Sequence, residues 1–155
     1  MQLHPDKTRL VDFRAGQKLQ HDDGDRPPTT FIFLGFTHVW GKSRWGKWTV
    51  RQVTAKDRFA RTLAAIDDQC RRMRHESLRE QHRSLCLKLK GHMAYFGITG
   101  NYRRIARLIV EAQRCWRKWL SRRTSDRRVS WDAFKRLLAR LPLPTPQIYR
   151  SYVGT

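Results

Sequence analysis

The adjacent carboxylates of the chain are Asp22 with Asp23 and Asp67 with Asp68. Such pairs could hold metal ions for phosphoryl transfer if their side chains converged on one site. Neighbouring residues on a helix point in different directions, so Asp67 and Asp68 are better explained as solvated helix residues close to arginines. The other pair lies in a polar loop with no aromatic strand before it. Neither pair is therefore predicted to form a catalytic centre.

Histidine, cysteine and serine also lack the spacing that catalysis or metal binding requires. The six histidines form no HExxH motif, and Cys70, Cys86 and Cys115 form no CxxC pair. No serine has a nucleophile-elbow context, and no Walker-type phosphate loop occurs. We therefore expect no catalytic residue, metal or cofactor in this chain. Free thiols, with no apolar run of membrane length and no signal peptide, predict a cytoplasmic protein that does not bind membranes.

Cations are the most abundant chemically useful groups. The 155 residues carry 33 Lys and Arg against 13 Asp and Glu, a formal net charge of +20. Residues 1–30 contain five of each sign, so the whole excess lies in residues 31–155. This density favours a polyanionic partner, best a nucleic acid, over a merely solvated surface. The strongest candidates for phosphate contacts are the cations of one run, Arg114, Arg117, Lys118, Arg122, Arg123, Arg127 and Arg128.

Two further stretches combine cations with aromatic rings. The turn at 41–47 holds Lys42, Arg44, Trp45 and Lys47, and its indole and that of Trp48 suit stacking on nucleic acid as well as contact with protein. Residues 88–104, KLKGHMAYFGITGNYRR, place glycines and aromatic rings between basic ends. We interpret this stretch as a glycine-broken corner between two basic helices, formed around Gly91, Gly97 and Gly100.

The elements that position these residues change type along the chain. Residues 8–13, 31–40 and 48–53 are strand-like. The last two are predicted to form a hairpin, with a bend or close backbone approach at Gly35. Residues 14–30 are polar and predict a loop. The fold class is therefore α+β, with a short β-hairpin portion over 1–53 and a basic bundle of three to four helices over 54–155.

Capping signals and apolar stripes define the four expected helices. The starts are predicted at Thr54 with Asp57, Ser77 with Glu80, Asn101, and Ser130. Prolines 142, 144 and 146 end the last helix and begin an extended tail. The inward-facing stripes are Phe59, Leu63, Ile66, Cys70 and Met73; Leu78, His82, Leu85, Leu89, His92 and Phe96; Tyr102, Ile105, Ile109, Ala112, Trp116 and Trp119; and Phe134, Leu137, Leu138 and Leu141.

Five blocks stand in one order: HPDKTRLVDF, FIFLGFTHVWGKSRWGKW, KLKGHMAYFGITGNYRR, WRKWLSRR, and W-x-x-F-x-x-L-L with LPLPTPQI. Together they resemble the C-terminal part of bacterial group II intron reverse transcriptase/maturases, mobile genetic elements. The resemblance covers nearly the whole chain. Its most specific pieces are Phe33 to Phe36 and Gly91 to Tyr102.

The resemblance implies a role for each region. Residues 1–53 would end the polymerase palm, with a primer grip at Leu34, Gly35 and Phe36. Lys7 would lie near the incoming nucleotide, although a surface lysine at a strand end explains it equally well. Residues 54–155 would be the thumb, or maturase domain X, which binds intron RNA, assists its folding and splicing, and clamps the template–primer duplex. Its residues facing RNA or supporting that face would be Lys88, Lys90, His92, Tyr95, Arg103 and Arg104.

The chain departs from the family pattern in its catalytic parts. The aromatic-x-Asp-Asp motif, the fingers, most of the palm and the HNH endonuclease of some members are absent from the sequence. We therefore expect no polymerisation by this chain alone, since Mg²⁺ would be bound by the palm. It would be a truncated or split product, or an excised domain, with a separately encoded N-terminal half as a further partner. The alternatives are the C-terminal half of an active split RNA-directed DNA polymerase, a generic basic DNA-binding helical protein, and a remnant without function.

Overall fold

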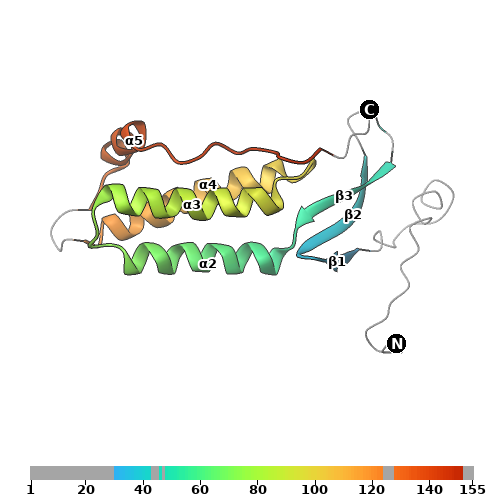
Figure 1. The fold of residues 1–155 in the computed structure, drawn as a ribbon, viewed down its shortest axis with the longest axis horizontal. Coiled ribbons are helices and arrows are strands. Elements are labelled where there is room, and N and C mark those ends of the chain that lie inside the picture. Colours follow the sequence, from blue (N-terminus) through green and yellow to red (C-terminus); the bar gives the residue numbers. More distant parts are fainter. Residues whose placement is uncertain (1–29, 43–45, 47, 124–127, 152–155) are drawn as a thin grey trace, which may run out of the picture. The chain divides into compact units, whose positions relative to one another are not determined.

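A computed structural model describes residues 30–42, 46, 48–123 and 128–151 (Figure 1). The elements are β1 (Phe31–Phe33), β2 (Phe36–Lys42), β3 (Trp48–Thr54), α2 (Lys56–Arg72), α3 (Leu78–Phe96), α4 (Tyr102–Leu120) and α5 (Trp131–Arg140). A small sheet followed by four helices confirms the predicted α+β class. The chain divides into two compact units, residues 1–53 and 54–155. The strand predicted at 8–13 and most of the loop predicted at 14–30 lie outside the described residues.

The first unit contains a three-stranded antiparallel sheet in the order β1-β2-β3. Phe31 pairs with His38 and Phe33 with Phe36, so the run predicted as one bent strand is instead a tight hairpin. Its two turn residues have positive φ, 48° at Leu34 and 80° at Gly35. This pattern matches a type I′ turn, whose backbone twist suits a two-residue hairpin.

A stacked pair of rings supports this hairpin. The His38 imidazole stacks on the Phe31 ring at a centroid distance of 4.5 Å, as expected for directly opposed residues. The Gln52 amide donates a hydrogen bond to His38 Nε2 over 3.1 Å. Since Gln52 lies on β3, this bond connects the outer strand to the hairpin.

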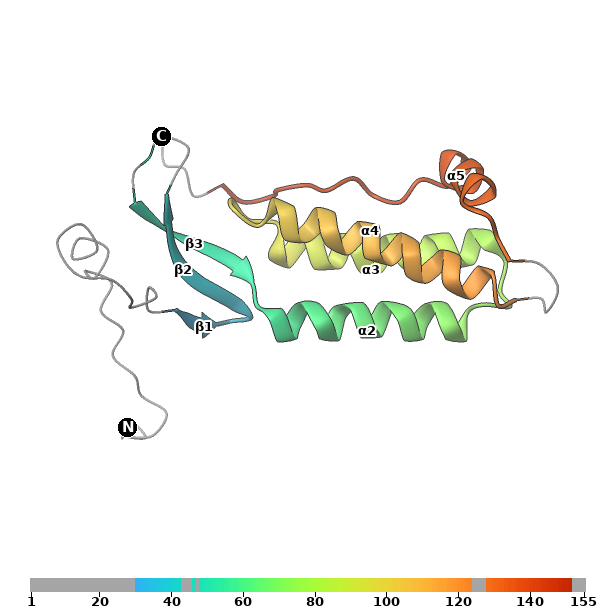
Figure 2. The same ribbon diagram turned by 180° about the vertical axis from the view of Figure 1, so that it is seen from behind.

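The second unit is built on three long helices that run alongside one another (Figures 1 and 2). α2 packs mainly against α4, and α3 contacts both. The predicted stripes supply most of the core, but Leu78 and Tyr102 are exposed and were wrongly placed there. Each is the first residue of its helix, where the side chain points back past the helix start. The buried core consists of Phe59, Ile66, Cys70, Leu85, Leu89, Met93, Ile105, Leu108, Ile109, Ala112, Trp116, Leu120, Phe134 and Leu143.

Two of the predicted helix starts are confirmed by side-chain caps. Ser77 Oγ accepts a hydrogen bond from the Glu80 backbone over 3.3 Å, and the Glu80 carboxylate accepts one from the Ser77 N–H over 3.1 Å. This is the reciprocal capping box. Ser130 Oγ likewise accepts from the Ala133 N–H over 3.2 Å at the start of α5.

The capping box predicted at Thr54 and Asp57 is wrong. α2 begins at Lys56, and its N-cap Ala55 makes no side-chain cap. The Asp57 carboxylate instead pairs with Arg61 one turn along the helix. Thr54 is buried, and its polar groups bind a distant residue.

That distant residue is Asn101, which occupies the predicted N-cap of α4 but does not cap it with its side chain. Asn101 Oδ1 accepts from the Thr54 N–H over 2.9 Å, and Nδ2 donates to Thr54 Oγ1 over 2.7 Å and to Phe96 O over 2.8 Å. Both Asn101 and Thr54 are fully buried. The amide therefore joins the start of the helical unit to the end of α3.

The corner between α3 and α4 is narrower than predicted. It spans Gly97 to Gly100, because Gly91 lies inside α3 and takes no part in it. A Cβ at position 97 would lie 2.3 Å from the Met93 carbonyl oxygen, so this close approach requires glycine. Gly100 has φ 91°, which also favours glycine.

The tail after α5 is extended, as predicted, and runs back along α3 and α4 towards this corner (Figure 2). The N–H groups of Tyr149 and Arg150 donate to Gly97 O over 2.7 and 3.0 Å, and the Thr99 N–H donates to Arg150 O over 3.0 Å. At the other end of the tail, His82 Nε2 lies 2.9 Å from Pro142 O. The tail therefore completes the hydrogen bonding of the corner.

Alanine substitutions at Gly91, inside α3, and at Gly97, just after α3, should have opposite effects on stability. Gly91→Ala is expected to raise the free energy of unfolding by about 0.5–1 kcal/mol, since its Cβ would meet nothing within 4 Å and glycine disfavours a helix interior. Gly97→Ala is expected to lower it by about 1–3 kcal/mol through overpacking against backbone. Urea denaturation followed by circular dichroism measures both. Equal effects would contradict this assignment of the corner.

Candidate nucleic-acid interface

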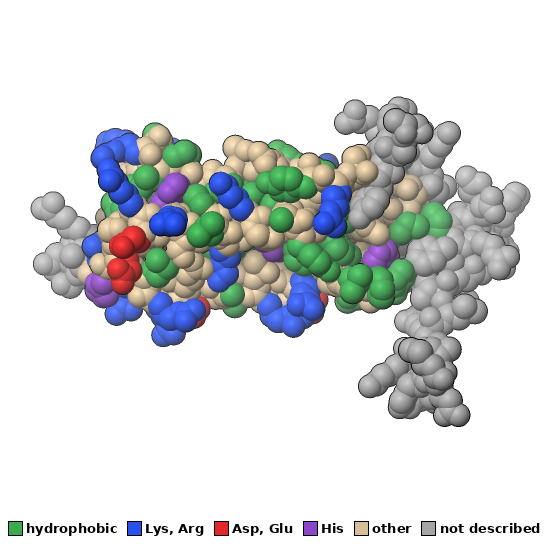
Figure 3. Space-filling view, viewed as in Figure 1, with side chains coloured by type: hydrophobic (Ala, Val, Ile, Leu, Met, Phe, Trp, Pro, Cys, Tyr) green, Lys and Arg blue, Asp and Glu red, His purple; other side chains and the backbone are tan. Residues whose placement is uncertain are grey.

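The helical unit has more cations than its carboxylates can neutralise. Figure 3 shows basic side chains scattered along one face of the helices, with acidic groups only in small spots. Every carboxylate on α2 and α4 already pairs with a nearby cation. These ion pairs are Asp57 with Arg61, Asp68 with Arg71 and Arg72, Asp67 with Lys118, and Glu111 with Arg114.

The Asp67–Asp68 pair does not converge on one site. Asp68 binds cations of its own helix, whereas Asp67 reaches α4 and accepts a hydrogen bond from Trp119 Nε1 over 3.0 Å. Partial burial alone would raise the pKa of Asp67, but hydrogen bonds from Lys118 and Trp119 outweigh it and lower the pKa. Asp67 therefore acts as a charged brace between α2 and α4.

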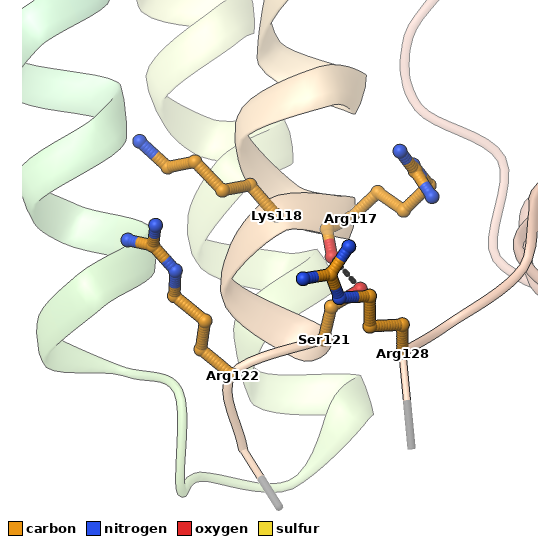
Figure 4. A pocket seen from close by; sticks show the side chains of 5 residues that line it. All are labelled: Arg117, Lys118, Ser121, Arg122 and Arg128. Atoms are coloured by element: carbon orange, nitrogen blue, oxygen red, sulfur yellow. Dashed lines mark hydrogen bonds between the residues drawn. The ribbon is translucent and has the colours of Figure 1, made fainter. Parts of the chain in front are cut away.

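A basic pocket lies at the C-terminal end of α4 (Figure 4). It is open to solvent and has a volume of about 420 Å³. All four of its cations belong to the basic run that was predicted to contact phosphate. Ser121 had no signal in the sequence that tied it to a site. We call the basic pocket the hollow lined by Arg117, Lys118, Ser121, Arg122 and Arg128.

One wall of the basic pocket is held rigidly. Arg117 Nη1 donates to Val129 O over 2.8 Å, and its guanidinium lies 4.0 Å from the Trp131 ring centroid. Ser121 Oγ donates to Arg117 O over 2.9 Å and accepts from the Val129 N–H over 3.1 Å. Arg117 Nε is buried and has no hydrogen-bond partner among the described residues. The Arg117 side chain therefore forms this wall, and the Ser121 hydroxyl holds it in position by binding both Arg117 O and the Val129 N–H.

The opposite wall is arranged around Trp119. Lys118 Nζ lies 4.9 Å and the Arg122 guanidinium 5.0 Å from the ring centroid, distances typical of cation–π contacts. Trp119 was predicted to be a core residue, but it is only partly buried. Its indole supports cations at the surface, because the neighbouring helix covers only part of the ring.

The candidates at the α3–α4 corner form a separate group. The His92 ring stacks on Phe96 at 4.5 Å, and the Tyr95 ring meets Phe96 edge-on at 4.7 Å. Burial lowers the pKa of His92 to about 4, so its imidazole is neutral at physiological pH. Tyr95 is 49% exposed. These rings can therefore offer apolar surface to a ligand, whereas His92 offers no positive charge.

The remaining cations near the corner differ in the contacts that their side chains make. Lys88 Nζ donates to Ala65 O over 3.0 Å, which draws it towards α2. The Arg104 guanidinium lies 5.8 Å from the Phe59 ring centroid. Lys90 and Arg103 are exposed. None of these residues lines the basic pocket, because the corner and the pocket lie at opposite ends of α4, roughly 28 Å apart along the helix.

Of the other cations of the basic run, Arg114 and Arg123 are engaged locally, and Arg127 lies outside the described residues. Arg114 pairs with Glu111 over 3.0 Å, and Arg123 Nη2 donates to His75 O over 3.3 Å. The structure thus brings Arg117, Lys118, Arg122 and Arg128 together and leaves Arg114 and Arg123 outside the pocket.

Comparisons with protein-family models, curated proteins and solved structures find no match. The function must therefore be argued from the chain's own residues and geometry.

The candidate residues of the primer-grip-like hairpin belong to the first unit. Leu34 and Gly35 form the β1–β2 turn, and Phe36 begins β2. Leu34 is 65% exposed beside the exposed Ile32 and Phe33. The turn therefore presents a short apolar tip. Lys42 is exposed at the end of β2. The other hairpin and palm candidates lie outside the described residues, and these are Lys7, Arg44, Trp45 and Lys47.

Metal binding and membrane insertion have no visible basis in the described parts of the chain. Residues 30–42, 46, 48–123 and 128–151 contain no cluster of three or more His, Cys, Asp or Glu side chains suited to a metal ion. Over the same residues, no helix combines the length and the apolar character needed to cross a bilayer. The cysteines are free thiols, and burial raises the pKa of Cys70 to about 12.

Proposed function

We propose that this chain is an RNA-binding maturase module, the thumb or domain X end of a group II intron reverse transcriptase. Its tasks would be to assist intron folding and splicing and to clamp a template–primer duplex. The observation that carries the proposal is the charge of the helical unit, where cations outnumber carboxylates that are already paired. The sequence blocks that resemble this family indicate which polyanion the module binds.

The arrangement of the helical unit supports RNA as the partner. Exposed arginines supply planar donors that match phosphate oxygens. The corner offers the exposed Tyr95 ring and the neutral His92 ring, which suit contact with bases or sugars of unpaired RNA. Phosphate and base contacts would then come from different ends of α4.

The catalytic parts of a reverse transcriptase would come from outside this chain. The catalytic aspartates and the Mg²⁺ of a reverse transcriptase would belong to a palm that this sequence does not contain. The Leu34–Gly35 turn would correspond to the primer grip of that palm. A separately encoded N-terminal half would be a further partner, and the module would work in the cytoplasm.

Binding to a structured group II intron RNA, compared with a scrambled RNA of equal length, tests the proposal. We expect tighter binding to the intron RNA. Raising the salt from about 50 to about 200 mM should weaken binding on the order of a hundredfold or more, because phosphate contacts release counterions. Titrations followed by fluorescence anisotropy measure both quantities.

Three outcomes would redirect the assignment. Equal affinity for both RNAs would contradict a maturase role and leave only non-specific charge. Tighter binding to duplex DNA than to structured RNA would favour the generic DNA-binding alternative. Primer extension after mixing with a palm-containing N-terminal half would favour the split polymerase.

A further inference from the structure

The basic pocket concentrates positive charge that the protein itself does not neutralise. Four cations line it, and the one carboxylate that pairs with any of them is Asp67, bound to Lys118, among the described residues. Arg128 makes no hydrogen bond or ion pair with the described part of the chain. Like charges that line one pocket repel one another, so an anion in the pocket would lower the free energy of the site.

The position of the pocket at a helix C-terminus would oppose an anion if the last carbonyls were free. They are occupied. The N–H groups of Ser121, Arg122 and Arg123 donate to the carbonyls of Arg117, Trp119 and Leu120 over 3.0, 3.1 and 3.2 Å. Ser121 Oγ donates a second bond to Arg117 O. The cations therefore dominate the field inside the pocket.

The donors are also prepared for a specific ligand. Arg117 is fixed by Val129 O and the Trp131 ring, and Arg122 rests on the Trp119 ring. A guanidinium held against an aromatic face keeps its edge N–H groups available for a fork-like contact with phosphate. Arg122 therefore loses less side-chain entropy on binding than an unrestrained arginine would. The volume, about 420 Å³, falls in the range of pockets that take a small ligand, such as one nucleotide.

We infer that the basic pocket binds a backbone phosphate, with its sugar, of the RNA proposed above as the partner. The inference rests on that proposed function and adds a location to it: an anchor for the RNA strand at the end of α4 remote from the corner. Arg122 and Arg128 would contact the phosphate oxygens, with Lys118 adding charge. Arg117 and Ser121 would hold the wall in place as positioning residues.

The test compares two double variants of the full chain that each remove two positive charges. Arg122→Gln with Arg128→Gln alters the pocket without touching the Arg117 brace. Lys135→Gln with Arg136→Gln alters exposed residues of α5 that do not line it. We expect the pocket variant to weaken intron RNA binding at least tenfold and to reduce the slope of log affinity against log salt by about one unit or more. The α5 variant should lose no more than about threefold.

The outcomes separate this inference from the proposed function. Equal losses in both variants, with the wild type still preferring intron RNA, would overturn the pocket and leave the maturase role intact. A wild type without that preference would overturn the maturase role, while a larger loss in the pocket variant would still support the anchor. Pocket-dependent binding of polyglutamate with no effect on RNA would show an acidic protein surface as the ligand. Arg128→Gln alone repeats the test should the double variant unfold.

Discussion

Replacing Trp116 by alanine is expected to lower the free energy of unfolding by roughly 3–5 kcal/mol. The side chain is 0% exposed and meets the Phe134 ring edge-on at 5.7 Å. Its Nε1 donates to Gln81 Oε1 over 2.9 Å, so truncation also leaves a buried acceptor without its donor. Urea denaturation at fixed pH, followed by helical circular dichroism, measures the loss.

Trp119 provides the matched control, since it lies on the same helix three residues further on. Its ring is only partly buried, and its indole donates to Asp67 at the surface. Trp119→Ala should therefore cost less than half as much as Trp116→Ala. A larger loss at Trp119 than at Trp116 would overturn the burial assigned to the two rings. Trp116→Phe isolates the hydrogen bond, because it keeps most of the aromatic volume.

Local features of the helices could be predicted from the sequence. Phe59, Ile66 and Cys70 recur at helical spacing and are buried, because the 3.6-residue period places them on one face whatever the rest of the chain does. The Ser77–Glu80 capping box was also predictable, since all its groups lie within four residues. Both signals are contained in a short window of the chain.

The β-hairpin at 31–42 shows where a local signal is insufficient. An aromatic and β-branched run continues on both sides of the turn, so nothing in the pattern separates β1 from β2. Gly35 did mark a backbone requirement, but Leu34 adopts a positive φ that its residue type rarely takes. Pairing between the two short strands decides the conformation, and the residue pattern of a single strand does not show with which strand it pairs.

The candidate site depended on packing in the same way. Arg117, Lys118, Arg122 and Arg128 were chosen as cations of one basic run along a helix and the loop after it. Their arrangement into a pocket also needs Ser121, which had no signal in the sequence. Helical spacing predicted that Trp119 would be buried with Trp116. Spacing gives the direction of a side chain and not how far the neighbouring helix covers it.

Asn101→Ala is expected to lower the free energy of unfolding by about 2–4 kcal/mol. The change leaves the buried Thr54 N–H without an acceptor and removes the donor to Thr54 Oγ1, whereas Phe96 O keeps the Ile98 N–H as a donor. Each unsatisfied buried group costs about 1–3 kcal/mol. Thr54→Val is the milder companion, since it removes the hydroxyl and keeps the backbone bond. Denaturation midpoints with unchanged m values would report the loss of stability in both variants. Faster hydrogen exchange at the Thr54 amide would show that Asn101→Ala acts at this bond.

Asn101→Ser then distinguishes the two roles that an asparagine at this position can play. Serine caps helices about as well as asparagine, so it should restore stability if Asn101 acts as the N-cap of α4. The asparagine amide instead spans Thr54 and Phe96, two groups 42 residues apart in the chain. A serine side chain has one hydroxyl and cannot replace all three bonds. We therefore expect the serine variant to remain close to the alanine variant, and stability near that of the wild type would contradict the bracing role.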